Sequence, residues 1–243
     1  MERPYKRPPI TEAVIEVRLS NDVDMKTIEK LKEKFSERYP LPPIALANFN
    51  VDIGSERATV SQRNDGYRLT DAEGLSVVII TPRSIVTSRL APYDGWESFF
   101  ETAGENWKIW KRFVGWQPVG RIGVRFINRI DIKAPGDTPI EMDDYFNFSL
   151  KLPTLDESKM NGFFVQASIN LMKEDFKVTI NTGVVQPVLI DHQSFVLDID
   201  LFRELNLAQN DKELWACINS ARRLKNMVFE ASITNRTREI FSR

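Results

Sequence analysis

The clearest pattern of apolar and polar positions lies in residues 120–132, GRIGVRFINRIDI. Side chains of a β-strand point alternately to its two faces, so even and odd positions lie on opposite sides. The even positions are apolar apart from one amide, and they are Ile122, Val124, Phe126, Asn128, Ile130 and Ile132. The odd positions include Arg121, Arg125, Arg129 and Asp131, with Gly123 and Ile127 among them. The segment is therefore predicted to be a strand with one core face and one charged face.

Residues 1–115 are predicted to form a strand, a helix, an antiparallel meander and a long helix. TEAVIEVRL alternates as a strand does, and the segment that follows places Ile28, Leu31 and Phe35 at helical spacing. The short strands expected next are ANFNVDI, RATVSQR, GYRLTD, LSVVIITP and SIVTSRL, with turns at NDG (64–66) and DAEG (71–74). The long helix is expected over residues 94–114, where Asp94 and Glu97 have capping-box spacing.

An aromatic stripe runs along this long helix. Its members are Trp96, Phe99, Phe100, Ala103, Trp107, Trp110 and Val114. The spacing is that of one face of an amphipathic helix, which predicts that the stripe packs into the core. The alternative is a binding groove for a partner or a flat ligand.

Residues 116–243 are predicted to repeat the same plan. After the strand at 119–132, a short helix is expected in TPIEMDDYFNFSL, and the later strands are FFVQASINLM, FKVTINTG, PVLID and SFVLDIDL. A final helix begins near residue 211, where Asn210 and Glu213 repeat the capping spacing. The predicted fold is α+β, with two related halves at 1–115 and 116–243, packed as one unit. This order resembles the pseudo-twofold saddle of TATA-binding-protein-like folds.

The charge balance restricts the partners that the chain can bind. Lys plus Arg number 33 and Asp plus Glu 34, so the formal net charge is -1 and a nucleic-acid site would have to be a local patch. The candidate patch lies in residues 221–243, and its basic residues are Arg222, Arg223, Lys225, Arg236, Arg238 and Arg243. The alternative is an ordinary solvated face. No apolar run approaches the ~20 residues that cross a bilayer, and the start lacks an apolar signal region, so a cytoplasmic protein without membrane association is expected.

Catalytic and metal-binding residues are scarce. The chain has one histidine, His192, and one cysteine, Cys217, which excludes a zinc site made from several of these residues. We expect His192 in an exposed turn and Cys217 buried or at the core boundary. Walker, dinucleotide-binding and nucleophile-elbow motifs are absent from the sequence. No catalytic residue, metal site or cofactor is predicted.

The charged face of the strand at 120–132 is the best candidate site. Arg121, Arg125 and Arg129 lie on one side of it, and arginine binds carboxylates and phosphates bidentately. The three are therefore candidate ligand-binding residues. The alternative is an internal ladder of ion pairs, for which VLDIDLF supplies Asp198 and Asp200.

Five separated motifs resemble those of an uncharacterised, sporadically distributed prokaryotic protein family of about this length. They are RPPITEAVIEVRL, SRLAPYDGW, GRIGVRFINRIDI, VLDIDLF and NMVFEASITNRTREIF. The resemblance covers nearly the whole chain. It implies no established activity, cofactor or catalytic residue, and the patchy distribution suggests mobile or defence-associated genes.

The leading functional hypothesis is a non-catalytic binding module that engages a protein partner or an anionic ligand. The lack of a catalytic constellation, the internal repeat and the arginine-bearing sheet face motivate it. The alternative is a nucleic-acid-binding regulator that uses a curved sheet or the basic C-terminal helix. A third hypothesis is an enzyme that acts on a phosphorylated small molecule through the three arginines.

Overall fold

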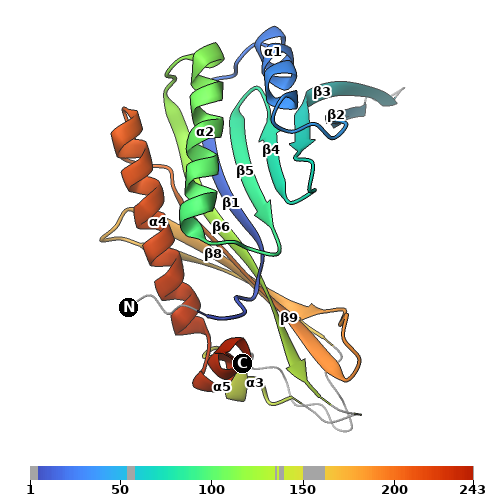
Figure 1. Ribbon diagram of the computed structural model, residues 1–243, viewed down its shortest axis with the longest axis vertical. Coiled ribbons are helices and arrows are strands. Elements are labelled where there is room, and N and C mark those ends of the chain that lie inside the picture. Colours follow the sequence, from blue (N-terminus) through green and yellow to red (C-terminus); the bar gives the residue numbers. More distant parts are fainter. Residues whose placement is uncertain (1–4, 54–57, 135, 137–139, 150–161, 243) are drawn as a thin grey trace. The chain divides into compact units, whose positions relative to one another are not determined.

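The computed structural model describes residues 5–53, 58–134, 136, 140–149 and 162–242. The strands there are β1 (Ile10–Leu19), β2 (Ile44–Ile53), β3 (Ala58–Thr70), β4 (Ser76–Ile80), β5 (Ser84–Leu90), β6 (Val119–Lys133), β7 (Phe164–Leu171), β8 (Phe176–Val185) and β9 (His192–Arg203). The helices are α1 (Met25–Ser36), α2 (Trp96–Val114), α3 (Met142–Tyr145), α4 (Asp211–Ser232) and α5 (Asn235–Ser242). The predicted α+β class is confirmed (Figure 1).

The strands form one antiparallel sheet, hydrogen-bonded in the order β2-β3-β4-β5-β1-β6-β9-β8-β7. The chain divides into two compact units. We call Val14–Ile122 with Leu207–Leu214 the N-terminal unit, and Met1–Ala13 with Gly123–Asn206 and Trp215–Arg243 the C-terminal unit. Strands β1 and β6 each have residues in both units, so each unit is described with its own part of them. The division predicted between residues 115 and 116 stays a prediction.

The N-terminal unit is built on α1 and α2. Helix α1 contacts β3, β4 and α2, and α2 contacts β5 (Figure 1). Helix α1 begins where the Asp24 side chain accepts a hydrogen bond from the backbone N–H of Thr27 (2.9 Å), as an N-cap does. It buries Ile28, Leu31 and Phe35, the three residues that the sequence pattern predicted.

The aromatic stripe of α2 lies in the core, as predicted. Trp110 is fully buried and Trp107 is 3% exposed. The predicted capping by Asp94 is wrong, because Gly95 occupies the cap position with φ 112° and α2 makes no side-chain cap. The Asp94 carboxylate instead accepts a hydrogen bond from Ser98 (3.1 Å).

Strand β3 differs from the prediction of two strands separated by a turn at NDG. The chain continues as one strand through residues 64–66, and the register against β2 shifts there as in a β-bulge. Gly66 has φ 133° and donates its N–H to the Asn64 side chain (3.1 Å). A Cβ at Gly66 would lie 2.1 Å from the carbonyl oxygen of Ile80, so glycine is required by close packing as well as by backbone conformation.

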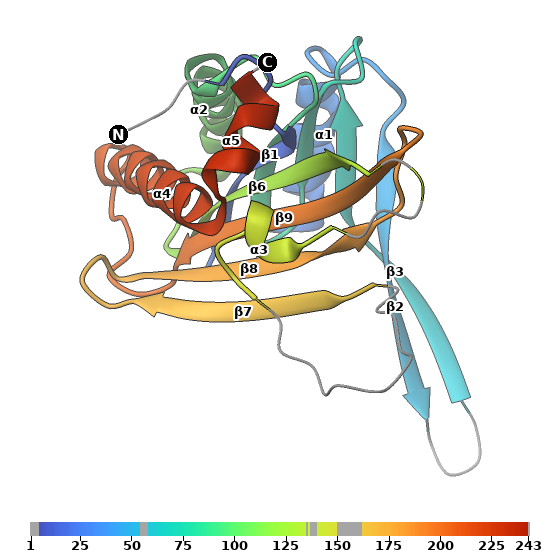
Figure 2. The ribbon, with the colours of Figure 1, turned by 90° about the horizontal axis from the view of Figure 1, so that it is seen from below.

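The C-terminal unit buries the apolar face of β6. Val124, Phe126, Ile130 and Ile132 are at most 2% exposed, which confirms the predicted alternation. The core-facing residues of β9 are Phe195, Leu197, Ile199 and Leu201. Helices α3, α4 and α5 lie on this side of the strands (Figure 2), where Phe146 packs against Phe195 and Lys225 lies over the Phe126 ring.

Two local predictions in this unit are wrong. PVLID is a turn rather than a strand, and it exposes Val188, Leu189 and Ile190. His192, expected in an exposed turn, is the half-buried first residue of β9. A run of apolar residues this short does not by itself distinguish a strand from a turn.

The start of α4 confirms the second predicted capping box. The Asn210 side chain accepts a hydrogen bond from the Glu213 N–H (3.0 Å) and donates one to the Glu213 carboxylate (2.7 Å). Further along α4, Leu214, Ile218 and Ala221 are fully buried. Among the described helices, none is both long and apolar enough to cross a membrane.

Candidate functional site

The charged side of β6 belongs to a polar sheet face in the C-terminal unit. It lies opposite the face that packs against α3, α4 and α5, and no described helix of this unit lies on it. We call it the uncovered face. Its polar members are Arg125, Arg129 and Asp131 on β6, Ser194, Asp198 and Asp200 on β9, Thr179 and Asn181 on β8, and Gln166, Ser168 and Asn170 on β7, and the same register also places the apolar Phe164, Val185, Val196 and Phe202 on it.

Arg125 and Asp198 form a bidentate ion pair at the centre of this face. Nε of Arg125 donates to Oδ1 of Asp198 (2.8 Å), and Nη2 donates to Oδ2 (2.7 Å). The Asp198 side chain is 6% exposed and that of Arg125 is 45% exposed. The nearly buried carboxylate therefore depends on a guanidinium that still reaches solvent.

The contacts continue across the sheet. Nδ2 of Asn181 donates to Oδ2 of Asp198 (2.9 Å), and Nε2 of Gln166 donates to Oδ1 of Asn181 (2.8 Å). The register explains this continuity, because Asn181 lies directly opposite Asp198 on β9 and Gln166 on β7. We call Arg125, Asp198, Asn181 and Gln166 the polar row. It crosses from β6 to β7.

Negative charge surrounds the guanidinium of Arg125. Hydrogen bonds to the Asp198 carboxylate raise the pKa of Arg125, while burial opposes this rise, and the charges of Asp198, Asp200 and Glu12 raise the pKa further. Three carboxylates thus act on one arginine. The local field disfavours an added anion and favours a cationic or hydrogen-bonding group.

Arg129, also in the C-terminal unit, makes contacts that are separate from the polar row. Its Nε donates to Asp131 (2.9 Å), and its Nη2 donates to the Gln186 carbonyl (2.9 Å) and to the Ser194 hydroxyl (3.0 Å). Ser194 also donates to Asp131. These contacts fix the arginine in place along β6.

Arg121 belongs to the N-terminal unit and pairs with Glu16 of β1. The other carboxylate oxygen of Glu16 accepts from Arg18 (2.9 Å). Arg121 is 12% exposed at its side chain, so it is the most buried of the three predicted arginines. Each unit therefore holds its own part of the arginine row.

All three predicted arginines have carboxylate partners. The Arg125–Asp198 pair is the contact that the ion-pair interpretation expected, and Asp200 acts on Arg125 through its charge. These contacts favour a structural role. The ligand-binding role of Arg121, Arg125 and Arg129 stays a prediction.

Sequence reasoning missed the two amides of the polar row. Asn181 lies in FKVTINTG and Gln166 in FVQASINL, where polar residues alternate with apolar ones. That alternation could have assigned both to one face. Their hydrogen bonds follow from strand register, which the alternation leaves open.

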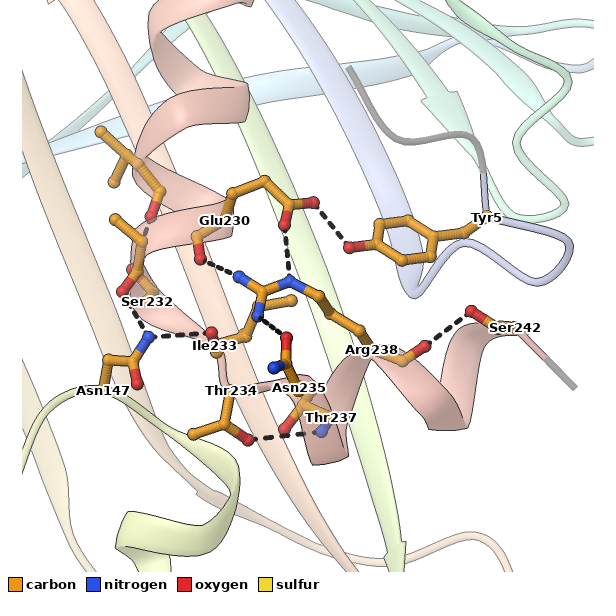
Figure 3. Close-up of polar contacts among 12 residues, drawn as sticks. Tyr5, Asn147, Glu230, Ser232, Ile233, Thr234, Asn235, Thr237, Arg238 and Ser242 are labelled. Carbon is orange, nitrogen blue, oxygen red and sulfur yellow. Dashed lines mark hydrogen bonds and ion pairs between the residues drawn. The ribbon is translucent and has the colours of Figure 1, made fainter. Parts of the chain in front are cut away.

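Basic residues of the predicted C-terminal patch are engaged in contacts at the end of α4 (Figure 3). Nε of Arg238 donates to one carboxylate oxygen of Glu230 (2.8 Å), and the hydroxyl of Tyr5 donates to the other (2.6 Å). Nη1 of Arg238 also donates to the side chain of Asn235 (2.9 Å). Glu230 of α4 thus joins Arg238 of α5 to Tyr5 of the N-terminal segment.

A second set of contacts joins α3 to the same place. Arg236 pairs with Asp144. Nδ2 of Asn147 donates to the carbonyl oxygens of Ala231 (3.0 Å) and Ile233 (2.9 Å), and Figure 3 shows Asn147 beside Ile233. Two of the patch arginines are therefore neutralised by carboxylates of the same unit. Arg243 lies outside the described residues.

The single cysteine is in a poor environment for a nucleophile. Cys217 is 7% exposed, and burial raises the pKa of its thiol although the charge of Arg203 opposes this. Among the described residues, His, Cys, Asp and Glu form no group of three or more that could hold a metal ion.

Comparison with models of known protein families found no family that matches this chain, and a search of curated proteins found no match either.

Proposed function

We propose that the chain is a non-catalytic binding module that engages a protein partner through the uncovered face of its C-terminal unit. The observation that carries this proposal is the polar row, which lies on a sheet face without a covering helix among the described residues of the unit. The exposed end of this row is hydrated, and a second molecule can replace that water. Here Arg125 remains 45% exposed, within reach of a second molecule.

The charge of this face favours a protein over an anionic ligand. The fork of Arg125 already binds Asp198, and Asp200 and Glu12 add negative charge around it. An anion would find two nitrogens of the guanidinium already bound to Asp198 and would be repelled by the charges of the three carboxylates. A protein surface with lysine, arginine or amide side chains would instead complement the carboxylates and the amides of Asn181 and Gln166.

A pair of matched variants tests the proposal by affinity purification from the native host, with mass spectrometry of bound proteins, nucleic acids and small molecules. Thr179→Arg adds bulk and charge to the uncovered face, while Met227→Arg makes the same addition on α4, where the side chain is 65% exposed. We expect a protein recovered with the wild type and with Met227→Arg to be lost with Thr179→Arg. Its retention by Thr179→Arg would refute the proposal.

The same purification tests the nucleic-acid alternative. Recovery of nucleic acid that is unaffected by Thr179→Arg but lost with Arg223→Glu, a change at an exposed position of α4, would favour a regulator that uses the basic C-terminal patch.

We also propose that the two halves of the chain descend from an internal duplication, with a TATA-binding-protein-like arrangement. Two features support it. Each half begins with a strand (β1, β6), continues through an antiparallel meander (β2–β5, β7–β9) and reaches a long helix (α2, α4), which the short helix α5 follows in the second half. The strand order also runs outward from β1 and β6 in the same sense, through β5 to β2 and through β9 to β7. The second meander has one strand fewer.

The proposed setting is the cytoplasm of a prokaryote, in a mobile or defence-associated gene context, as a member of the family that the five motifs resemble. Fractionation of the host followed by immunoblotting tests the location.

A further inference from the structure

The outer edge of β7 offers main-chain hydrogen-bonding groups. β7 ends the strand order, so only β8 pairs with it among the described strands. The N–H of Val184 donates to the carbonyl of Phe163 (3.1 Å), which sets the phase of the antiparallel ladder. By this phase, the main-chain groups that point away from β8 are those of Phe164, Gln166, Ser168 and Asn170.

This edge lacks the features that normally prevent pairing with another chain. Proteins protect free edges with charged residues, prolines, bulges or very short strands. β7 has eight residues, FVQASINL, with no charge and no proline, and its register against β8 is regular. The strand at the other end of the order, β2, includes Asp52.

We propose that β7 pairs antiparallel with β7 of a second copy of this chain, across a two-fold axis at Ala167. In this register Gln166 lies opposite the second copy's Ser168, and Val165 lies opposite the second copy's Ile169. Each residue whose main-chain groups point away from β8 then donates one hydrogen bond to the opposite residue of the second copy and accepts one from it. The symmetry is that of an isologous dimer, in which one strand serves both sides of the interface.

The side chains of β7 suit pairing with themselves. Gln166 meets Ser168 on the uncovered face, Val165 meets Ile169 on the helix side, and no like charges oppose one another; at the two ends of the pairing Phe164 meets Asn170. Ile169 is 47% exposed, although its neighbour on β8, Val178, is 1% exposed. A second β7 would cover Ile169 and extend the core across the new strand pair.

The pairing does not rest on the proposed partner of the uncovered face, because it uses the main chain of the edge. An extended peptide of another protein could use the same edge. The absence of charge on β7 favours the second copy, because the strand has no charged side chains that would select a peptide of different sequence.

Sedimentation of the purified protein over a range of concentrations tests the proposal. We expect a dimer for the wild type and a monomer for Ser168→Pro, since proline removes an outward N–H and leaves the hydrogen bonds to β8 in place. Ser168→Ala is the matched control and should remain dimeric. A wild type that stays monomeric at every soluble concentration, or a dimer that survives Ser168→Pro, would overturn the proposal.

A charge-exchange experiment tests the register independently of proline. Ala167 is exposed, so glutamate or lysine there should be compatible with folding, which circular dichroism checks. At the two-fold axis each variant places like charges side by side, so Ala167→Glu and Ala167→Lys should each be monomeric. An equimolar mixture should restore the dimer. Dimers of either variant alone would exclude an axis at Ala167.

Discussion

Each unit contains a polar network, and the two differ in how they meet solvent. In the N-terminal unit Asn106 is fully buried, and its Nδ2 contacts the hydroxyl oxygens of Tyr39 (2.7 Å) and Thr87 (3.0 Å). In the C-terminal unit the polar row begins at the half-exposed Arg125 and ends at the exposed Gln166. One network is sealed between α1, α2 and the sheet, and the other is open at both ends.

The difference separates two uses of polar side chains inside a fold. A sealed network has lost its hydration, so its members must satisfy one another and cannot exchange partners without unfolding. An open network retains water as a competing partner, and a second molecule can replace that water at low cost. The sealed network therefore specifies packing, whereas the open one is available for recognition.

The largest expected effect lies on the sealed side. Trp110 is fully buried in α2, so Trp110→Ala should lower the free energy of unfolding by about 3–5 kcal/mol. Denaturation in urea measures it. Phe113→Ala on the same helix is the control, because Phe113 is 39% exposed and should cost far less. Equal midpoints for the two variants would show that the aromatic stripe does not hold the core.

The sequence predicted the two faces of β6 and the stripe of α2 because both depend only on local periodicity. Alternation placed Phe126 and Arg125 on opposite sides, and helical spacing buried Trp107. The partners of Arg125 depended on which strand lies beside β6 and in which register, information that periodicity lacks. Asp198 was foreseen as an ion-pair partner from the charges available, but Asn181 and Gln166 were not.

Local turn chemistry was a less reliable guide than periodicity. Asn64 and Gly66 are residue types typical of a hairpin turn. They lie instead in a bulge of β3, which pairs with β2 and β4. At the start of α2 the residue types of a capping box are present, but Gly95 takes the cap position. At β3 strand pairing decided between alternatives that the local sequence allows, and at α2 the helix begins one residue later than the capping pattern predicted.

An intermediate effect is expected from the two partners of the open network. Arg125→Ala leaves the nearly buried Asp198 carboxylate with the Asn181 amide as a hydrogen-bond donor, and should cost about 2–3 kcal/mol. The loss is smaller than for a fully buried pair because Arg125 is 45% exposed. Asp198→Asn should cost less, since the arginine that it frees can be hydrated.

Chemical denaturation of both variants, together with partner recovery, distinguishes a structural role of Arg125 from a binding role. Lost partner binding with unchanged stability would identify Arg125 as part of a ligand site. Lost stability would identify it as the counter-ion that keeps Asp198 charged. A larger loss for Asp198→Asn than for Arg125→Ala would contradict the asymmetry inferred from their exposures.

The smallest expected effect concerns Tyr39 in the sealed network, and it depends on pH. Burial raises the pKa of Tyr39 above its ordinary value of 10.0, although the hydrogen bond with Asn106 opposes the rise. Tyr39→Phe removes one hydroxyl from the network and should cost about 1 kcal/mol near neutral pH.

Above about pH 10 the unfolded chain loses the Tyr39 proton while the folded protein retains it, so the wild type is destabilised. The phenylalanine variant lacks this ionisation, and tyrosines common to both proteins cancel in the difference. The difference in unfolding free energy between the wild type and Tyr39→Phe should therefore narrow between about pH 8 and about pH 11, as measured by urea denaturation at each pH. A constant gap over that range would show that the Tyr39 hydroxyl is not sealed.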